Sequence, residues 1–188
     1  MSEEFMLGKE GIISIIVDWN EYDHQRAGGL ISGVLTKNDS VVDCDLSAFV
    51  MKKYGDKYEN LGEVNYAHPS FATSAIIHHG DNTKTGRDNE KLDVNLESIS
   101  EDESIVLTLD TLKDKKRLKI GRISQISISI YKNGNELYRT AAGGTGERAV
   151  RLGKIFRENN NFFFKVDMTA LNGVNEKSDI LSAIFKGR

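Results

Sequence analysis

Oxygen-bearing side chains are concentrated in residues 81–90 (DNTKTGRDNE), which include three carboxylates and two carboxamides. These are ligands that Ca²⁺ prefers, since it takes about six to eight oxygen atoms in a flexible geometry. Gly80 and Gly86 let the backbone turn sharply on either side of Asp81. The segment lacks the regular spacing of an EF-hand. Ordinary polar turns have the same residue types, and composition alone favours a turn over a calcium site.

A second acidic group lies at the start of residues 43–51 (DCDLSAFVM). Side chains on a strand alternate between its faces, which places Asp43 and Asp45 on one face. Cys44 and the apolar residues that alternate with it take the other face, which is typical of core. The two aspartates then point the same way and can approach the 81–90 loop. Taken alone, simple solvation of an aspartate pair at a strand start is the better interpretation.

The elements that must position these side chains are short strands. The sequence predicts an all-β fold, an antiparallel β-sandwich of about ten short strands with a short C-terminal helix, in one domain over residues 1–188. Asn133-Gly134 predicts a type I′ hairpin, and residues 158–161 predict a second hairpin. Residues 180–185 form the predicted helix, capped by Asn175 or Ser178. The predicted strands are 12–17, 30–36, 43–51, 61–66, 74–79, 92–96, 105–109, 123–131, 136–140, 149–156 and 162–166.

Composition excludes several classes of function. The net charge of −3 gives no basic excess, so we expect no nucleic-acid partner. No apolar run approaches the roughly 20 residues of a spanning helix, so we expect no direct membrane insertion. The N-terminal residues lack the basic and apolar regions of a signal peptide, and the single cysteine excludes an intrachain disulfide, so a cytoplasmic location is expected.

Catalytic signals are weak. The adjacent His78 and His79 face opposite sides of a strand and do not easily share one metal. The glycine-rich residues 141–148 lack the spacing of a phosphate loop or a dinucleotide fingerprint, and a flexible inter-strand loop explains them. Cys44 alternates into the apolar face, which predicts an inert buried thiol. No Ser-His-Asp arrangement can be assembled, and we expect a non-enzymatic protein.

Several stretches resemble the TerD family of bacterial tellurite-resistance and stress-response proteins. The similarity runs in one register from about residue 12 to residue 166, which is most of the chain. The 78–90 stretch is the most specific, because it resembles the family's His-Thr-Gly-Asp-Asn, Thr-Gly and Asp-Asp-Glu motifs in order. The stretches that carry the resemblance are VDWN at 17–20, DCDLSAF at 43–49, HHGDN at 78–82, TG at 85–86, DNE at 88–90 and GKIFREN at 153–159.

The resemblance implies a calcium-binding β-sandwich, often with two ions. The implied ligands are Asp43, Asp45, Asp81, Asn82, Asp88, Asn89 and Glu90. This chain departs from the family pattern in the loop, because Arg87 alone separates Thr85-Gly86 from the acidic residues and the loop is two residues short. Asn89 also replaces an aspartate. Fewer anionic ligands and an added cation weaken calcium binding, so the expectation is one or two ions.

The resemblance therefore implies a calcium-binding, non-enzymatic protein of a bacterial stress-response or tellurite-resistance system. Its expected partners are proteins of a stress-response complex, which the sequence does not identify. The alternative is a metal-free β-sandwich module that engages a small ligand or a protein through the same loop rim. Metal titration discriminates between the two. The sequence does not determine the oligomeric state.

Overall fold

The computed structural model describes residues 3–21, 42–81, 89–113, 120 and 123–186. The strand predicted at 30–36 lies outside the described residues. Within the part of the chain that is described, two six-stranded antiparallel sheets pack face to face, and one α-helix follows near the C-terminus. The predicted all-β sandwich with a short C-terminal helix is confirmed.

Sheet A has the strand order β1-β12-β11-β8-β3-β4, and sheet B has the order β10-β9-β2-β7-β6-β5. In chain order the strands of sheet A are β1 (Glu4–Gly8), β3 (Asp45–Tyr54), β4 (Lys57–Val64), β8 (Glu103–Asp110), β11 (Ala149–Glu158) and β12 (Asn161–Ala170). Those of sheet B are β2 (Ile12–Glu21), β5 (Ser70–Phe71), β6 (Ile76–Asp81), β7 (Asn89–Asn95), β9 (Ile123–Lys132) and β10 (Asn135–Ala142). A short 3-10 turn, η2 (Leu96–Ser98), follows β7, and helix α1 spans Lys177–Lys186.

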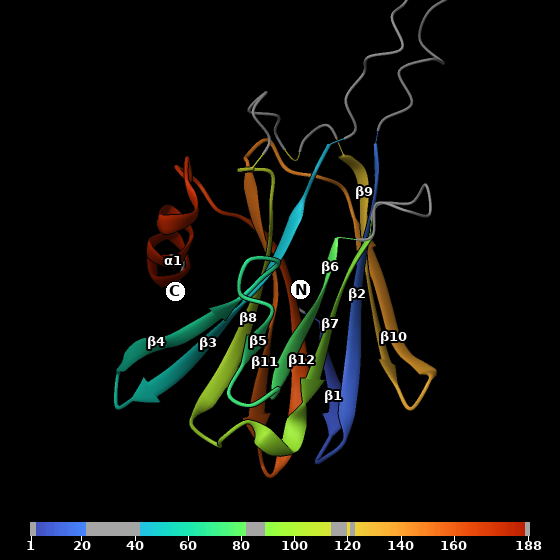
Figure 1. The fold of residues 1–188 in the computed structure, drawn as a ribbon, viewed down its shortest axis with the longest axis vertical. Helices are drawn as coiled ribbons and strands as arrows, with labels where there is room; N and C mark the ends of the chain where they lie inside the picture. The colour runs from blue at the N-terminus through green and yellow to red at the C-terminus, as the bar shows by residue number, and fades with distance from the viewer. Residues whose placement is uncertain (1–2, 22–41, 82–88, 114–119, 121–122, 187–188) are drawn as a thin grey trace, which may run out of the picture.

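The main core lies between the sheets because the strands alternate apolar and polar side chains. Cys44, just before β3, and the alternating residues Leu46, Ala48 and Val50 of β3 are buried there, as the sequence predicts. The opposite face of β3 carries a second apolar cluster. Phe49 and Met51 pack there with Ile180 and Ile184 of α1, which accounts for the position of the helix outside sheet A, at the left in Figure 1.

Two predicted hairpins are confirmed by their backbone geometry. Asn133 and Gly134 have φ values of +53° and +78° between β9 and β10. Asn159 and Asn160 have φ values of +48° and +65° between β11 and β12. A two-residue turn with both central residues at positive φ is the type I′ turn, whose twist matches that of paired strands.

The segment around residues 72–90 differs from the predicted boundaries. Positive φ values at Ala72, Thr73 and Ser74 form a turn, so β6 begins at Ile76 rather than at residue 74. Gly80 does not end β6, which continues to Asp81. The register of β6 against β7 shifts between His78 and Asp81, and Asp81 pairs with Glu90. The prediction placed Asn89 and Glu90 in a loop, and this was wrong, because both belong to β7.

Candidate metal centre

Several of the predicted ligands lie at one end of the sandwich. β3 and β7 begin there, while β6 and β8 end there, at the upper end of Figure 1. Asp45 is the first residue of β3 and pairs with Asp110, the last residue of β8. Directly opposed residues on antiparallel strands share a face, with Cβ atoms about 4.5–5.5 Å apart. The register of sheet A therefore places two carboxyl groups side by side on its outer face.

The carboxyl group of Asp45 is buried and has no hydrogen-bond partner among the described residues. Its exposed fraction is 0%, and neither oxygen accepts a hydrogen bond from the described residues. The Lys113 ammonium lies 3.7 Å from Asp45 Oδ1, beyond hydrogen-bond distance. Burial raises the pKa of Asp45 to about 6, the charge of Lys177 opposes that rise, and the charge of Asp110 adds to it. The charges of Lys177 and Lys113 therefore offset only part of the cost of burying this carboxylate.

Asp110 has a different environment although it is equally buried. Its Oδ2 atom lies 2.6 Å from the ammonium of Lys177 in α1, and its Oδ1 accepts a hydrogen bond of 3.0 Å from the amide of Leu112. Burial raises the pKa of Asp110, and Lys177 opposes that rise. Sequence analysis missed this residue. An aspartate at the end of an apolar strand gave a weak signal, and its position beside Asp45 depends on the register of β3 against β8.

Glu90 faces the space between the sheets rather than a loop. β4 ends opposite Ala48, and beyond that point Glu90 Oε2 accepts a hydrogen bond from the amide of Leu46. The same oxygen lies 3.3 Å from His78 Nε2. Since His78 Nδ1 accepts a 2.9 Å hydrogen bond from the Gly80 amide, the neutral imidazole carries its proton on Nε2, toward Glu90. Glu90 therefore links sheet B to the start of β3.

A residue of sheet B also contacts the segment that leads into β3. The indole nitrogen of Trp19 donates a 3.1 Å hydrogen bond to the carbonyl of Val42. Asp43 follows and is half-buried. Burial raises the pKa of the Cys44 thiol, and four surrounding acidic groups, among them Asp43 and Asp110, raise it further. This end of the sandwich therefore carries a concentration of negative charge.

The predicted ligands are thus only partly brought together. Asp43 lies just before β3, and Asp45 is the first residue of β3. Glu90, from the other sheet, accepts a hydrogen bond from the Leu46 amide of the same strand. The backbone of Asp81 pairs with Glu90, and Asn89 pairs with Asp18 of β2. Asn82 and Asp88 lie outside the described residues. Within the described ranges, no group of three or more His, Cys, Asp or Glu side chains is placed to hold a metal ion.

The two adjacent histidines face opposite sides, as predicted. His78 is buried beside Glu90, whereas His79 is exposed, and its Nε2 lies 2.6 Å from Asp93 Oδ2 on the outer face of sheet B. The glycine-rich segment has a structural explanation. A Cβ at Gly144 would lie 2.1 Å from the carbonyl oxygen of Ile120, so the close approach of these two segments requires glycine.

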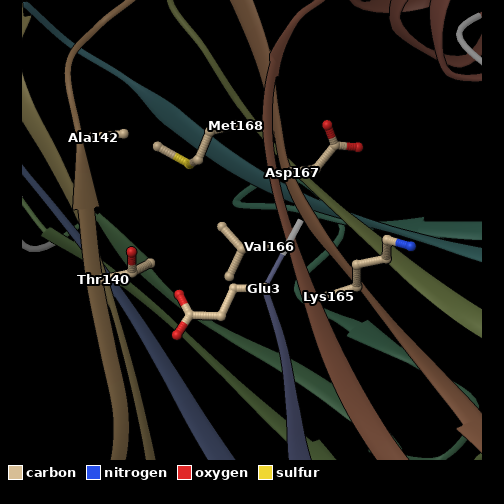
Figure 2. Close-up of a pocket in the computed structure, with 7 residues that line it drawn as sticks. All are labelled: Glu3, Thr140, Ala142, Lys165, Val166, Asp167 and Met168. Atoms are coloured by element: carbon tan, nitrogen blue, oxygen red, sulfur yellow. The ribbon is translucent and has the colours of Figure 1, made fainter. Parts of the chain in front are cut away.

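One cavity of about 500 Å³ lies between β10 and β12 and is shown in Figure 2, where Met168 points toward Ala142 while Lys165 and Asp167 point to the other side of β12. The remaining lining residues are Glu3, Thr140 and Val166. No helix within the described ranges is long and apolar enough to cross a membrane.

These features define a two-sheet antiparallel β-sandwich with buried and half-buried carboxyl groups at one end. Residues 8–174 match the TerD domain, and the chain belongs to the TerD domain family. The structure is similar to that of SAV2460, a protein of unknown function, with a TM-score of 0.65 and 14% identity over 96% of this chain and 99% of that chain.

A second similar structure is that of SCO6318 from Streptomyces coelicolor A3(2), a homologue of the telluride resistance protein TerD. Its TM-score is 0.58, with 11% identity over 93% of this chain and 95% of that chain. At these identities the two structures establish similarity of fold. The comparison with curated proteins gives no match.

Proposed function

We propose that this chain is a calcium-binding, non-enzymatic protein of a bacterial stress-response or tellurite-resistance system. The observation that supports calcium binding most directly is Asp45, whose carboxyl group is fully buried while neither oxygen accepts a hydrogen bond from the described residues. A buried carboxylate without hydrogen-bond donors is stabilised when a cation binds it.

The donor set fits a hard cation better than a transition metal. The candidate ligands offer carboxylate and carboxamide oxygens, which suit Ca²⁺. The nearby thiol of Cys44 and imidazole of His78 are not placed to bind such a metal. Cys44 points into the core with a raised pKa, which disfavours the thiolate that a metal requires. Both ring nitrogens of His78 face hydrogen-bonding groups, Glu90 and Gly80.

Asp43 and Asp45 would hold one or two Ca²⁺ ions from the β3 side. Asp81 at the end of β6, Asn89 at the start of β7, and Asn82 and Asp88 between them in the sequence would supply the other oxygens. Glu90, the last of the residues implied by family resemblance, already accepts hydrogen bonds through Oε2, so we assign its role to joining β7 with β3. The bound ion would neutralise carboxylates that otherwise repel one another, and it would tie the two sheets together at this end.

The non-enzymatic assignment has separate support. Within the described residues, the cysteine is buried in the core and the buried histidine is paired with a carboxylate. Neither group borders the cavity between β10 and β12. The stress-response role is carried over from the family and from a relative described as a homologue of a telluride resistance protein. We expect the partners to be proteins that recognise the calcium-bound end of the sandwich.

Calcium titration of the pure protein tests this proposal. A ligand that binds only the folded state stabilises it by about 2.7 kcal/mol at 100 times its dissociation constant, so calcium raises the melting temperature. Magnesium gives a smaller rise because it keeps its water and demands octahedral geometry. Trp19 is the single tryptophan and contacts Val42 beside Asp43, so its fluorescence reports binding independently.

Matched variants locate the site. Asp45→Asn and Asp81→Asn each reduce the calcium-dependent melting shift, whereas Asp56→Asn, on the exposed turn between β3 and β4, leaves it unchanged. If millimolar calcium gives neither titration heat nor a melting shift in the unmodified protein, calcium binding is refuted. The metal-free binding module then becomes the better interpretation.

A further inference from the structure

Helix α1 places a lysine directly on the acidic end of sheet A. Lys177 is the first residue of α1, and its ammonium lies 2.6 Å from Asp110 Oδ2 and 3.4 Å from Ser47 Oγ. Its side chain is about one-third exposed, with a value of 32%, whereas the Asp110 carboxyl group is 0% exposed. The lysine therefore reaches from solvent into a buried acidic pair.

The pair needs such a cation because two carboxyl groups are adjacent in a buried place. Asp45 and Asp110 are directly opposed across β3 and β8, and the charge of Asp110 makes ionisation of the Asp45 carboxyl group more costly. The positive charge of Lys177 favours the ionised form of both carboxyl groups. Lys113 adds a longer contact, 3.7 Å, to Asp45. One ammonium hydrogen-bonded to Asp110 still leaves Asp45 without a hydrogen-bond donor in the described part of the chain.

We propose that Lys177 and a divalent cation are alternative counter-ions of the carboxyl groups of Asp45 and Asp110. Asp110 is then a further carboxylate of the metal site, which the loop motif does not contain, and Lys177 is a built-in competitor that sets the affinity. This inference rests on the proposed calcium binding. A cation that coordinates Asp110 displaces the ammonium, because two positive centres on one carboxylate repel each other at this distance.

The competition couples metal binding to the start of α1. Lys177 supplies a polar attachment of the first helical turn, while Ile180 and Ile184 supply apolar attachments further along. Arg148 also donates hydrogen bonds to the carbonyls of Asn175 and Thr111, at 3.1 and 3.0 Å. Displacement of Lys177 therefore loosens the first turn of α1 and leaves the rest of the helix attached, which gives a partner protein a calcium-dependent surface.

The test compares calcium affinity by calorimetry in four proteins: unmodified, Lys177→Met, Asp110→Asn and the control Lys186→Met. Lys186 lies on the same helix and is exposed, so the control removes the same charge away from the pair. Removing a unit charge a few ångströms from the ion at an effective dielectric constant of about 20 predicts about tenfold or more tighter binding for Lys177→Met. Asp110→Asn weakens binding, and Lys186→Met leaves it unchanged.

The second measurement uses the unmodified protein alone, so it does not depend on how the variants fold. Amide hydrogen exchange is followed with and without calcium. Saturating calcium accelerates exchange in the first turn of α1 relative to β11, an interior strand of sheet A. Unchanged relative exchange overturns the coupling between the metal and α1.

The outcomes separate this inference from the proposed function. Calcium binding of equal affinity in the unmodified protein and Lys177→Met overturns the competition and leaves calcium binding intact. Binding by Lys177→Met alone supports the competition in its strongest form, with the lysine excluding the metal. Absence of binding in both proteins overturns the inference together with the proposed function.

Discussion

Asp45 and Asp110 are paired across the adjacent strands β3 and β8 and are equally buried, but their carboxyl groups differ in their hydrogen-bond partners. Asp110 contacts Lys177 and the Leu112 amide, whereas neither oxygen of Asp45 accepts a hydrogen bond from the described residues. The difference arises because α1 begins over β8 and delivers one ammonium to a site with two carboxyl groups. The fold thus leaves Asp45, where β3 enters sheet A, with only partial compensation from the Lys113 and Lys177 charges.

The first prediction concerns pH in calcium-free buffer. Burial raises the pKa of Asp45 from 3.8 to about 6, so the folded state holds this proton more tightly than the unfolded state. The contribution of Asp45 to the free energy of unfolding is therefore most favourable below about pH 4 and is lost as the pH rises through about 6. One pKa unit corresponds to about 1.4 kcal/mol, so Asp45→Asn gains about 1–3 kcal/mol relative to the unmodified protein between pH 4 and 7.

Urea unfolding at several pH values measures this difference. The exposed Asp56→Asn variant is the control and keeps the pH dependence of the unmodified protein. A constant difference in the free energy of unfolding between Asp45→Asn and the unmodified protein across this range contradicts the assignment of Asp45 as a buried acid with a raised pKa.

The second prediction concerns the link between the sheets. Glu90→Ala removes the acceptor of the buried Leu46 amide and the partner of His78. Leaving a buried donor unsatisfied costs about 1–3 kcal/mol, and the lost packing adds to this. We expect Glu90→Ala to lower the free energy of unfolding by at least that amount, measured by denaturant titration. Glu97→Ala, at an exposed position beyond the same strand, changes it by less than about 0.5 kcal/mol.

The third prediction separates two glycines of one segment. A Cβ at Gly144 would lie 2.1 Å from the carbonyl oxygen of Ile120 and 2.7 Å from that of Ile123, whereas a Cβ at Gly146 meets nothing within 4 Å. Gly144→Ala therefore forces backbone movement and destabilises the protein by about 1–3 kcal/mol or more. Gly146→Ala is neutral within about 0.5 kcal/mol. Equal melting temperatures for the two variants would show that the close approach is not maintained in solution.

Local pattern was enough to predict most of the fold. The alternation in β9, the Asn133-Gly134 turn and the two faces of β3 follow from side-chain direction and turn chemistry, and all are present. The short strands β1 and β5 were not predicted. β5 has two residues, too few to show a period, and β1 pairs with β12 across nearly the whole chain.

The candidate site was less predictable because it depends on long-range register. Asp45 belongs to a recognisable motif, but Asp110 and Lys177 become its neighbours through the pairing of β3 with β8 and the docking of α1. Glu90 belongs to the same motif and was placed in the loop. Its alternation with the buried Leu92 and Val94 assigns it to β7 and turns it toward the interior. Spacing identified the residue types, and tertiary structure decided which face each one takes.

The last prediction concerns the single thiol. Cys44 is 0% exposed, and burial together with surrounding carboxylates raises its pKa. The thiolate is the reactive form, so a thiol reagent at neutral pH labels the native protein at the rate of unfolding or local opening and labels the urea-unfolded chain rapidly. Tellurite reduction by the pure protein is then no faster than in buffer, and Cys44→Ala behaves identically. Rapid labelling of the native protein, or reduction that is abolished in Cys44→Ala, would contradict both the buried position of this thiol and the non-enzymatic assignment.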